Sequence, residues 1–311
     1  MKLFAKPTRI AFMAKRYHAV IFSGTLILVS LVSFFVRGLA LGIDFTGGTV
    51  IEVGYAQPVD LSQVRATLKG AGFGDATVQH FGTPRDVLIR LAPREGEDSA
   101  KLSDHAFAAL KEAVGGKVEL RRVEFVGPQV GDELTEDGGL AILYSLIGIL
   151  IYVAMRFEYR FAMGSVIALI HDVIITVGFF SLFQIQFDLT VLAAVLAVIG
   201  YSLNDTIVVF DRIRENFRKV RKGTVISIID QSINETLSRT LVTSGTTLLV
   251  LIALFLLGGE IIHGFALALI LGIVVGTYSS IYVASTAVVM LGVSRSDLMP
   301  VKKEKEVDGM P

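Results

Sequence analysis

An aspartate, Asp205, lies inside a long apolar stretch of the sequence, TVLAAVLAVIGYSLNDTIVVF at residues 190–210. A charged side chain at the centre of a membrane helix costs roughly 2.5–3.5 kcal/mol by insertion scales, so it usually faces a polar pathway or a partner. Because burial disfavours the charged form, such a group can alternate between neutral and charged states, as a proton relay requires. We therefore expect Asp205 and its neighbour Asn204 to belong to a proton path. The alternative is a structural aspartate that holds helices together.

A polar stripe on the next apolar stretch could supply a partner for Asp205. Arg239 precedes this stretch, and four hydroxyl side chains follow at the i, i+3, i+4 and i+7 positions of one helix face: Thr240, Thr243, Ser244 and Thr247. If this face is turned toward Asp205, Arg239 would favour the ionised aspartate, and the hydroxyl groups would carry water and hydrogen bonds. Two alternatives remain. Arg239 could be an anchor at the membrane surface, and the hydroxyl groups could bond back to their own helix.

A second pair of ionisable residues, His171 and Asp172, lies near the middle of the third apolar stretch. Adjacent residues on a helix point about 100° apart. We therefore expect one of the two to face the helix bundle and the other to face a neighbouring polypeptide or a cavity. The alternative is a structural hydrogen bond from this pair to another helix.

Several kinds of chemistry are excluded by composition. The chain has no cysteine, which excludes disulfides, thiolate metal sites and cysteine nucleophiles. His80 and His105 are isolated, and the Gly-Gly-Lys at 115–117 is followed by Val118 rather than the Ser or Thr of a phosphate-binding loop. We expect no enzymatic activity, no metal and no cofactor. The 29 basic and 29 acidic residues balance, and we expect no nucleic-acid partner.

The elements that must position these residues are six apolar stretches, each long enough to cross roughly 30 Å of hydrocarbon. They lie at 18–36, 138–155, 162–184, 189–210, 241–258 and 263–291. Lys and Arg cluster at both ends of the chain and in alternate loops, whereas the loops near Asp188 and Glu260 carry none. By the positive-inside rule both termini are cytoplasmic. In the last stretch, Gly272 and Gly276 have a spacing that predicts close helix packing.

The segment 37–137 lies between the first two stretches and, with this topology, outside the cytoplasm. Alternating apolar residues predict strands at 49–55, 77–81, 86–91 and 117–126. Helical periodicity predicts one helix capped by Asp60 and another over 102–114. The order βαββαβ is that of a ferredoxin-like α+β domain.

Two glycine-rich segments, LGIDFTGG at 41–48 and VGPQVGDEL at 126–134, join this domain to the membrane. Glycine permits backbone conformations that other residues avoid, and proline fixes its own. The pattern predicts specified bends, which are either hinges that let the domain swing or rigid turns that seat it. The residues concerned are Asp44, Gly47, Gly48, Gly127, Pro128 and Gly131.

The expected organisation has five parts. They are a cytoplasmic segment 1–17, transmembrane helix 1 at 18–36, the exported domain 37–137, transmembrane helices 2–6 within 138–291, and a cytoplasmic tail 292–311. Apolar residues at helical spacing near 224–237 predict an amphipathic helix at the cytoplasmic surface of the membrane. These residues are Ile226, Ile229, Ile233 and Leu237.

Several ordered motifs, spread over nearly the whole chain, resemble those of the SecF family, the smaller subunit of the SecD–SecF pair of bacterial protein export. Besides the two linkers they are RFEYRFAMGSVIALIHDV, YSLNDTIVVFDRIREN, TLSRTLVTSGTT and FALALILGIVVGTYSSIYVAS. The resemblance implies membership of the resistance-nodulation-division superfamily, whose transporters have twelve spans in two related halves. The expected fold is one such half: an α-helical polytopic membrane protein with six transmembrane helices and an exported ferredoxin-like domain.

The resemblance also implies a function. SecF-type subunits reside in the bacterial inner membrane and, with SecD, use the proton gradient to promote late-stage translocation of polypeptides. In this family the carboxylate of the Leu-Asn-Asp segment and the arginine of the Ser-Arg-Thr segment belong to the proton path, and here these are Asp205 and Arg239. Two alternatives are a structural scaffold without proton flux and half of a small-molecule exporter of the same superfamily.

The partners implied by the resemblance are SecD in a heterodimer, the SecYEG translocon, a YajC-type small subunit, the YidC insertase, an unfolded preprotein, protons and membrane lipid.

Overall fold

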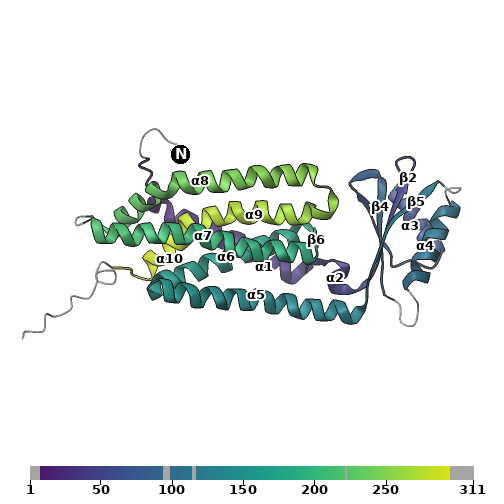
Figure 1. Cartoon of the computed structure of the whole chain (residues 1–311), viewed down its shortest axis with the longest axis horizontal. Coiled ribbons are helices and arrows are strands. Elements are labelled where there is room, and N and C mark those ends of the chain that lie inside the picture. Colours follow the sequence, from purple (N-terminus) through teal and green to yellow (C-terminus); the bar gives the residue numbers. More distant parts are fainter. Residues whose placement is uncertain (1–7, 94–98, 114–116, 221–222, 295–311) are drawn as a thin grey trace, which may run out of the picture.

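The computed structural model describes residues 8–93, 99–113, 117–220 and 223–294. These residues form a bundle of long helices with an α+β domain at one end (Figure 1). In this described part, six helical segments are long and apolar enough to cross a membrane. The predicted polytopic membrane protein with an attached α+β domain is therefore confirmed.

The long helices are α1 (Arg16–Arg37), α5 (Pro128–Arg156), α6 (Tyr159–Phe183), α7 (Leu189–Lys219), α8 (Val225–Leu257) and α9 (His263–Ser279). A single-turn 3-10 helix, η1 (Met13–Lys15), precedes α1, and another, η2 (Glu260–Ile262), precedes α9. After α9 the chain continues through a π-helical turn, η3 (Ser280–Ala284), into α10 (Ser285–Met290). Helix α7 is central, because it packs against α6, α8 and α9.

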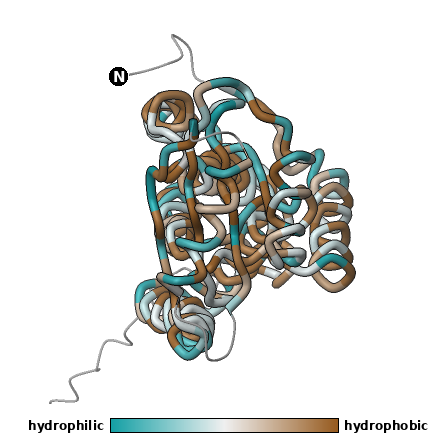
Figure 2. Tube along the Cα trace, turned by 90° about the vertical axis from the view of Figure 1, so that its right-hand side faces the viewer, coloured by the Kyte–Doolittle hydropathy of each residue, from teal (hydrophilic) through white to brown (hydrophobic). Residues whose placement is uncertain are grey.

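The outer surface of the bundle is apolar, as a lipid-facing surface must be. Leu249 is 70% exposed, Phe35 80% and Leu257 85%. Figure 2 looks along the bundle from the domain end and shows apolar segments on outward faces as well as between the helices.

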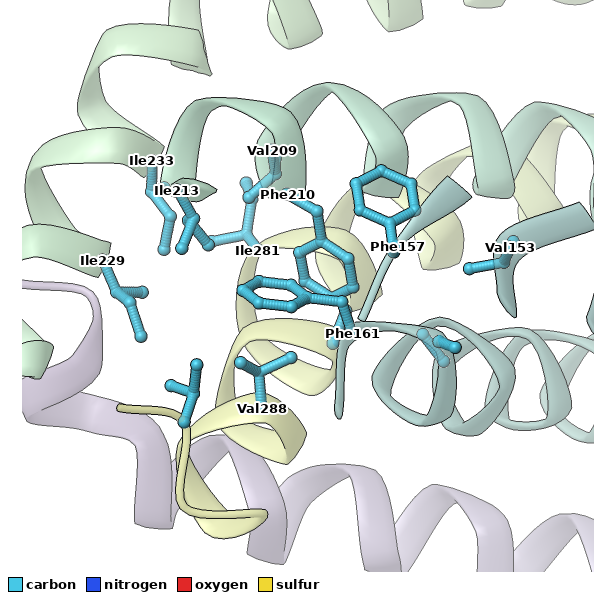
Figure 3. Packing of buried hydrophobic residues seen from close by; sticks show 14 of the residues in the cluster. Val153, Phe157, Phe161, Val209, Phe210, Ile213, Ile229, Ile233, Ile281 and Val288 are labelled. Carbon is cyan, nitrogen blue, oxygen red and sulfur yellow. The ribbon is translucent and has the colours of Figure 1, made fainter. Parts of the chain in front are cut away.

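The bundle end that lies away from the domain has a core of aromatic and branched side chains. Phe161 packs edge to face on Phe210, with ring centroids 5.0 Å apart, and Phe157 also contacts Phe210. Figure 3 shows these rings with Ile229 and Ile233 from α8 nearby. This core joins α6, α7, α8 and the end of the α9–α10 segment.

The segment near 224–237 does not form the separate helix expected at the membrane surface. It is the first part of α8, which runs without a break from Val225 to Leu257. Ile229, Ile233 and Leu237 are buried in the core just described rather than facing lipid. The expectation was wrong because an apolar helix face can be covered by protein as well as by membrane.

The α+β domain contains strands β2 (Gly48–Tyr55), β3 (Thr77–Phe81), β4 (Thr83–Leu91) and β5 (Val118–Val126), with helices α3 (Leu61–Gly70) and α4 (Ser99–Ala113). The antiparallel sheet has the order β3-β4-β2-β5, which is the ferredoxin-like order. Asp60 caps α3, because its side chain accepts a hydrogen bond of 2.9 Å from the Ser62 amide. The βαββαβ prediction is therefore confirmed.

The two faces of the sheet have different partners. On one face, Ile51, Val53, Val87 and Ile89 pack with apolar residues of α3 and α4. On the other face, Val50 and Leu88 pack against Ile43, which lies in the short helix α2 (Ile43–Thr46) between α1 and the domain.

The two linkers contact each other closely. A Cβ on Gly47 would lie 2.9 Å from Pro128 Cα, and a Cβ on Gly131 would lie 2.8 Å from the Gly47 nitrogen. Both Gly47 and Gly48 have positive φ, 66° and 120°, which favours glycine. The segment VGPQVGDEL is mostly helical, since α5 begins at Pro128, a position that tolerates proline.

A second connection joins the end of α1 to the start of α7. Strand β1 (Ala40–Leu41) pairs in parallel with β6 (Gln186–Phe187), and the Gly42 amide donates to the Phe187 carbonyl oxygen at 2.8 Å. In Figure 1, α2 and β6 lie at the end of the bundle nearest the domain.

Candidate functional site

Asp205 lies inside the bundle where α7, α8 and α9 meet. Its side chain is 3% exposed, and Asp205 Oδ2 accepts a long hydrogen bond of 3.4 Å from Ser244 Oγ on α8. Ser244 Oγ in turn lies 2.8 Å from Thr277 Oγ1 on α9. The carboxyl group is therefore buried and weakly hydrogen-bonded, beside a short chain of hydroxyl groups.

Two further hydroxyl groups belong to this region of α7 and α8. Thr206 follows Asp205, and Thr240 lies one helical turn before Ser244. Both side chains are buried, and neither hydroxyl has a hydrogen-bond partner among the residues that the structure describes. The surroundings of Asp205 therefore include buried hydroxyl groups from both α7 and α8.

The other predicted relay residues lie on the outer face of α7 and α8. Arg239, Asn204 and Thr243 are exposed, and Thr247 is half-buried. Arg239 is close enough to attract Asp205 electrostatically, yet within the described ranges it makes no ion pair with it. The structure thus brings Asp205 together with Ser244, and places the arginine beside the site rather than in it.

The hydroxyl groups of Thr243 and Thr247 bond back to their own helix. Thr243 Oγ1 donates to the Arg239 carbonyl at 3.1 Å, and Thr247 Oγ1 donates to the Thr243 carbonyl at 3.0 Å. The alternative that the hydroxyl groups bond back to their own helix therefore holds for Thr243 and Thr247. Ser244, on the same polar stripe, points toward Asp205 instead.

His171 and Asp172 do not diverge as the 100° helix rotation suggested. Both are buried, and His171 Nδ1 lies 2.8 Å from Asp172 Oδ1. Asp172 Oδ2 accepts from Ser202 Oγ on α7 at 2.5 Å and from Ser279 Oγ on α9 at 2.7 Å. His171 Nε2 reaches Ser23 Oγ on α1 at 3.1 Å. One network therefore joins α1, α6, α7 and α9, and the expectation that only one member faces the bundle was wrong.

Residues that sequence reasoning did not assign to a site complete these networks. Tyr278 OH lies 3.1 Å from Ser23 Oγ and donates to the Ala19 carbonyl at 3.0 Å. Thr277, its neighbour on α9, contacts Ser244. The sequence signal for these residues is the run of polar side chains that follows Gly276. This run was not sufficient to identify a site, because small and polar residues are also typical of ordinary helix packing.

The glycines of α9 allow α7 to approach. A Cβ on Gly272 would lie 2.1 Å from Val198 Cγ2, and one on Gly276 would lie 3.0 Å from Ser202 Cβ. The close approach at Gly276 places Ser202 where it can reach Asp172.

In the described part of the α+β domain, the two histidines are not grouped with other ionisable residues that could bind a metal ion. His80 and His105 are exposed, and the His105 ring packs on Phe73. Over the described ranges, no group of three or more His, Asp or Glu side chains could hold a metal ion.

Comparison with known families gives two matches. The family model described as "Protein export membrane protein SecD/SecF, C-terminal" matches residues 106–294. The model described as "SecD/SecF GG Motif" matches residues 32–59, a range that includes Asp44, Gly47 and Gly48.

Individual relatives agree with these models. The chain is 58% identical to the protein translocase subunit SecF of Vibrio alginolyticus over 97% of each chain. It is 47% identical to the SecF of Escherichia coli O157:H7, over 96% of this chain and 93% of the relative. The crystal structure of SecDF, a translocon-associated membrane protein from Thermus thermophilus, matches with a TM-score of 0.83 and 37% identity. That match covers 93% of this chain and 39% of the longer one.

The fold and these matches define a multi-pass membrane protein of the SecD/SecF protein-export type. The chain belongs to the SecF family of protein translocase subunits.

Proposed function

We propose that this chain is an accessory subunit of the Sec translocase that, with SecD, couples inward proton movement to late-stage translocation of preproteins across the bacterial inner membrane. The observation that carries the proposal is the buried, weakly hydrogen-bonded carboxyl group of Asp205 at the junction of α7, α8 and α9. A buried ionisable group in a membrane protein is a functional-site hypothesis by default.

In the proposed cycle, a proton from outside neutralises Asp205 and weakens its attraction to Arg239, so that α7 and α8 shift relative to each other. The proton then leaves toward the cytoplasm. Each inward proton releases about 2.3 kcal/mol per 100 mV of membrane potential. Since about 1.4 kcal/mol corresponds to tenfold in an equilibrium constant, one proton can bias a two-state helix movement substantially.

SecD is the proposed partner at the outer face of α7 and α8. This face carries exposed Arg239 and Asn204, and nothing lies within 4 Å of a Cβ placed on Gly200 or Gly245. An exposed arginine and open glycines at membrane depth fit a neighbouring helix better than lipid. SecYEG, an unfolded preprotein, a YajC-type small subunit and YidC are the further partners of the complex.

The proposed topology places both termini in the cytoplasm and the α+β domain outside it. Helix α5 ends at Arg156 and α7 ends at Lys219, and both helices end on the side of the bundle opposite the domain (Figure 1). This distribution supports the positive-inside assignment.

The test is preprotein export in cells whose only copy of this subunit carries Asp205→Asn. We expect export to fall to the level of the deletion strain, because Asn cannot gain or lose a proton. Asp211→Asn is the matched control, since Asp211 lies on the same helix, has a side chain that is 41% exposed, and pairs with Arg156 at 3.0 Å. Membrane levels of the subunit and of SecD are measured in parallel. Normal export with Asp205→Asn at normal levels would overturn the proposal.

A scaffold without proton flux is the second candidate, and the outward position of Arg239 favours it. If Arg239 serves only as a surface anchor, Arg239→Lys would retain export because both side chains can snorkel. If the arginine interacts with Asp205 during the cycle, Arg239→Lys should lower export severely at an unchanged protein level.

A further inference from the structure

The first turn of α7 is capped by two carboxylates from different parts of the chain. Asp188 Oδ1 accepts a hydrogen bond of 2.9 Å from the Val191 amide. Asp44 Oδ2, from the linker that follows α1, accepts one of 3.0 Å from the Leu189 amide. Both satisfy amides that lack a partner within the helix, and both lie at the positive end of the helix dipole.

The same linker is attached to the α+β domain. Ile43, which precedes Asp44, packs against Val50 and Leu88 of the sheet. Because β1 also pairs with β6, the linker is fixed on one side to the sheet and on the other side to the start of α7. Asp44 is the residue at which these two attachments meet.

Arg90 on β4 extends this junction into the domain. It pairs with Val50 across the sheet and shares the strand face of Leu88, two residues earlier, so it lies on the face that α2 covers. Its Nε and Nη2 atoms are buried, and within the described residues they have no hydrogen-bond partner. Burial lowers the pKa of Arg90, whereas the charges of Asp188 and Asp44 act in the opposite direction.

This arrangement is an ion pair that is not closed. Arg90 lies on the sheet face that α2, with its Asp44, covers, but it makes no ion pair in the part of the chain that the structure describes. A guanidinium whose Nε and Nη2 atoms have no partner among the described residues can bind a carboxylate in bidentate fashion. A small movement of α7 or of the domain would therefore change the number of charged contacts across the junction.

We propose that Arg90, Asp44 and Asp188 form a charge cluster that couples the orientation of the α+β domain to the position of α7. The cluster closes when Arg90 binds the carboxylates at the start of α7 and opens as in this structure. Asp205 lies on the same uninterrupted helix, about 26 Å from Asp188 at 1.5 Å per residue. The claim that translocation uses this coupling rests on the proposed function. The coupling between the domain and α7 is independent of that function.

The test measures the distance between the domain and the bundle in the full chain reconstituted in lipid nanodiscs. The chain has no cysteine, so spin labels attach only at introduced sites. Lys111→Cys on α4 and Leu257→Cys at the end of α8 are suitable, since both residues are exposed. Pulsed electron-spin measurements on this pair report the populations of closed and open arrangements.

We expect Arg90→Gln to lower the ratio of closed to open populations about fivefold, in line with the loss of one partly screened ion pair. Asp44→Asn should act similarly while keeping an oxygen for the Leu189 amide, so loss of the helix cap is not the cause. The double variant should add little to either single change. Arg90→Lys should restore most of the parent distribution, and Arg85→Gln, on an exposed part of the same strand, should not alter it.

An unchanged distribution in Arg90→Gln would overturn the charge cluster, whatever Asp205→Asn does to export. If the distribution shifts but Asp205→Asn leaves export intact, the cluster stands and the proposed proton coupling is wrong. A shift of equal size in Arg85→Gln would mean that the net charge of the domain, rather than the charge cluster, determines the orientation of the domain.

Discussion

At the residue scale, two buried aspartates in neighbouring helices have different surroundings. Asp172 receives hydrogen bonds at 2.5 and 2.7 Å from two serines and lies 2.8 Å from His171 Nδ1. Among the residues that the structure describes, Asp205 receives a single bond, at 3.4 Å from Ser244. A carboxylate with several short bonds is fixed in position by its neighbours, whereas one with a single long bond is held less tightly. The contrast fits a structural role for Asp172 and is consistent with the relay proposed for Asp205.

The first prediction concerns Asp172. Asp172→Ala should destabilise the protein by about 1–3 kcal/mol, because it leaves buried hydroxyl and imidazole groups without their acceptor. Asp172→Asn should cost less, since an amide oxygen remains. Unfolding of the full chain in mixed micelles of increasing SDS content measures the difference, with Asp137→Ala on the exposed face of α5 as the control. Equal stability of Asp172→Ala and the parent would show that the network contributes nothing.

The second prediction concerns Tyr55 in the α+β domain. Burial raises the pKa of Tyr55 to about 12 from 10.0, and its hydroxyl has no partner among the described residues. A phenol whose pKa is higher in the folded state keeps its proton there, so stability falls as pH rises above 10. Tyr55→Phe should remove this part of the pH dependence and be neutral or slightly stabilising at pH 8. Denaturant unfolding of the parent and the variant at pH 8 and pH 11 tests it, and parallel pH profiles would contradict it.

At the element scale, the sequence predicted what depends on local pattern. Alternating apolar residues and the Asp60 cap identify the domain, and apolar length identifies the spans. It did not predict β1 and β6, because each has two residues and the pairing depends on contacts between segments far apart in the chain. The sequence also did not predict that α8 is one continuous helix. No glycine or proline at the boundary between its polar first part and its apolar second part shows whether the helix ends there.

The candidate site shows the same division. Asp205 was identifiable because a charge in an apolar stretch is costly anywhere along the helix. The partner hydroxyl was not, because Thr240, Thr243, Ser244 and Thr247 lie on one stripe and only the packing of α8 on α7 turns Ser244 inward. His171 and Asp172 pair because two adjacent side chains can bend toward each other, which a rotation angle between Cα positions does not describe.

The third prediction tests the α7–α9 contact. Gly272→Ala should destabilise by about 1–3 kcal/mol, because the new methyl group would overlap Val198. All three near atoms belong to the Val198 side chain, so adding Val198→Ala should restore much of the loss. Gly148→Ala on α5 is the control, since nothing lies within 4 Å of its Cβ position. The same SDS unfolding measures all four proteins, and a failure of Val198→Ala to rescue would mean that the strain lies elsewhere.

At the scale of the whole molecule, the question is how the domain and the bundle are joined. If the glycine-rich segments at 41–48 and 126–134 were two separate flexible hinges, the domain could swing freely. Instead the linkers are packed together, α2 bridges the sheet and α7, and α5 runs from Pro128 on the domain side through the length of the bundle (Figure 1). A junction of this kind does not swing freely, so a change in the orientation of the domain requires a shift of α5 or α7.

The last prediction distinguishes a packed junction from a pair of hinges. Gly131→Ala should separate the linkers, because a methyl group there would lie 2.8 Å from the Gly47 nitrogen and 3.0 Å from the Phe45 carbonyl oxygen. Gly127→Ala is the matched control in the same linker, since its φ of −66° is open to any residue and its Cβ position has no neighbour within 4 Å. If the junction transmits movement, Gly131→Ala should lower export and increase protease cleavage between residues 41 and 48, with Gly127→Ala close to the parent. If the glycines serve as hinges, Gly127→Ala should impair export at least as strongly, because it restricts the backbone of the same linker without disturbing the packing.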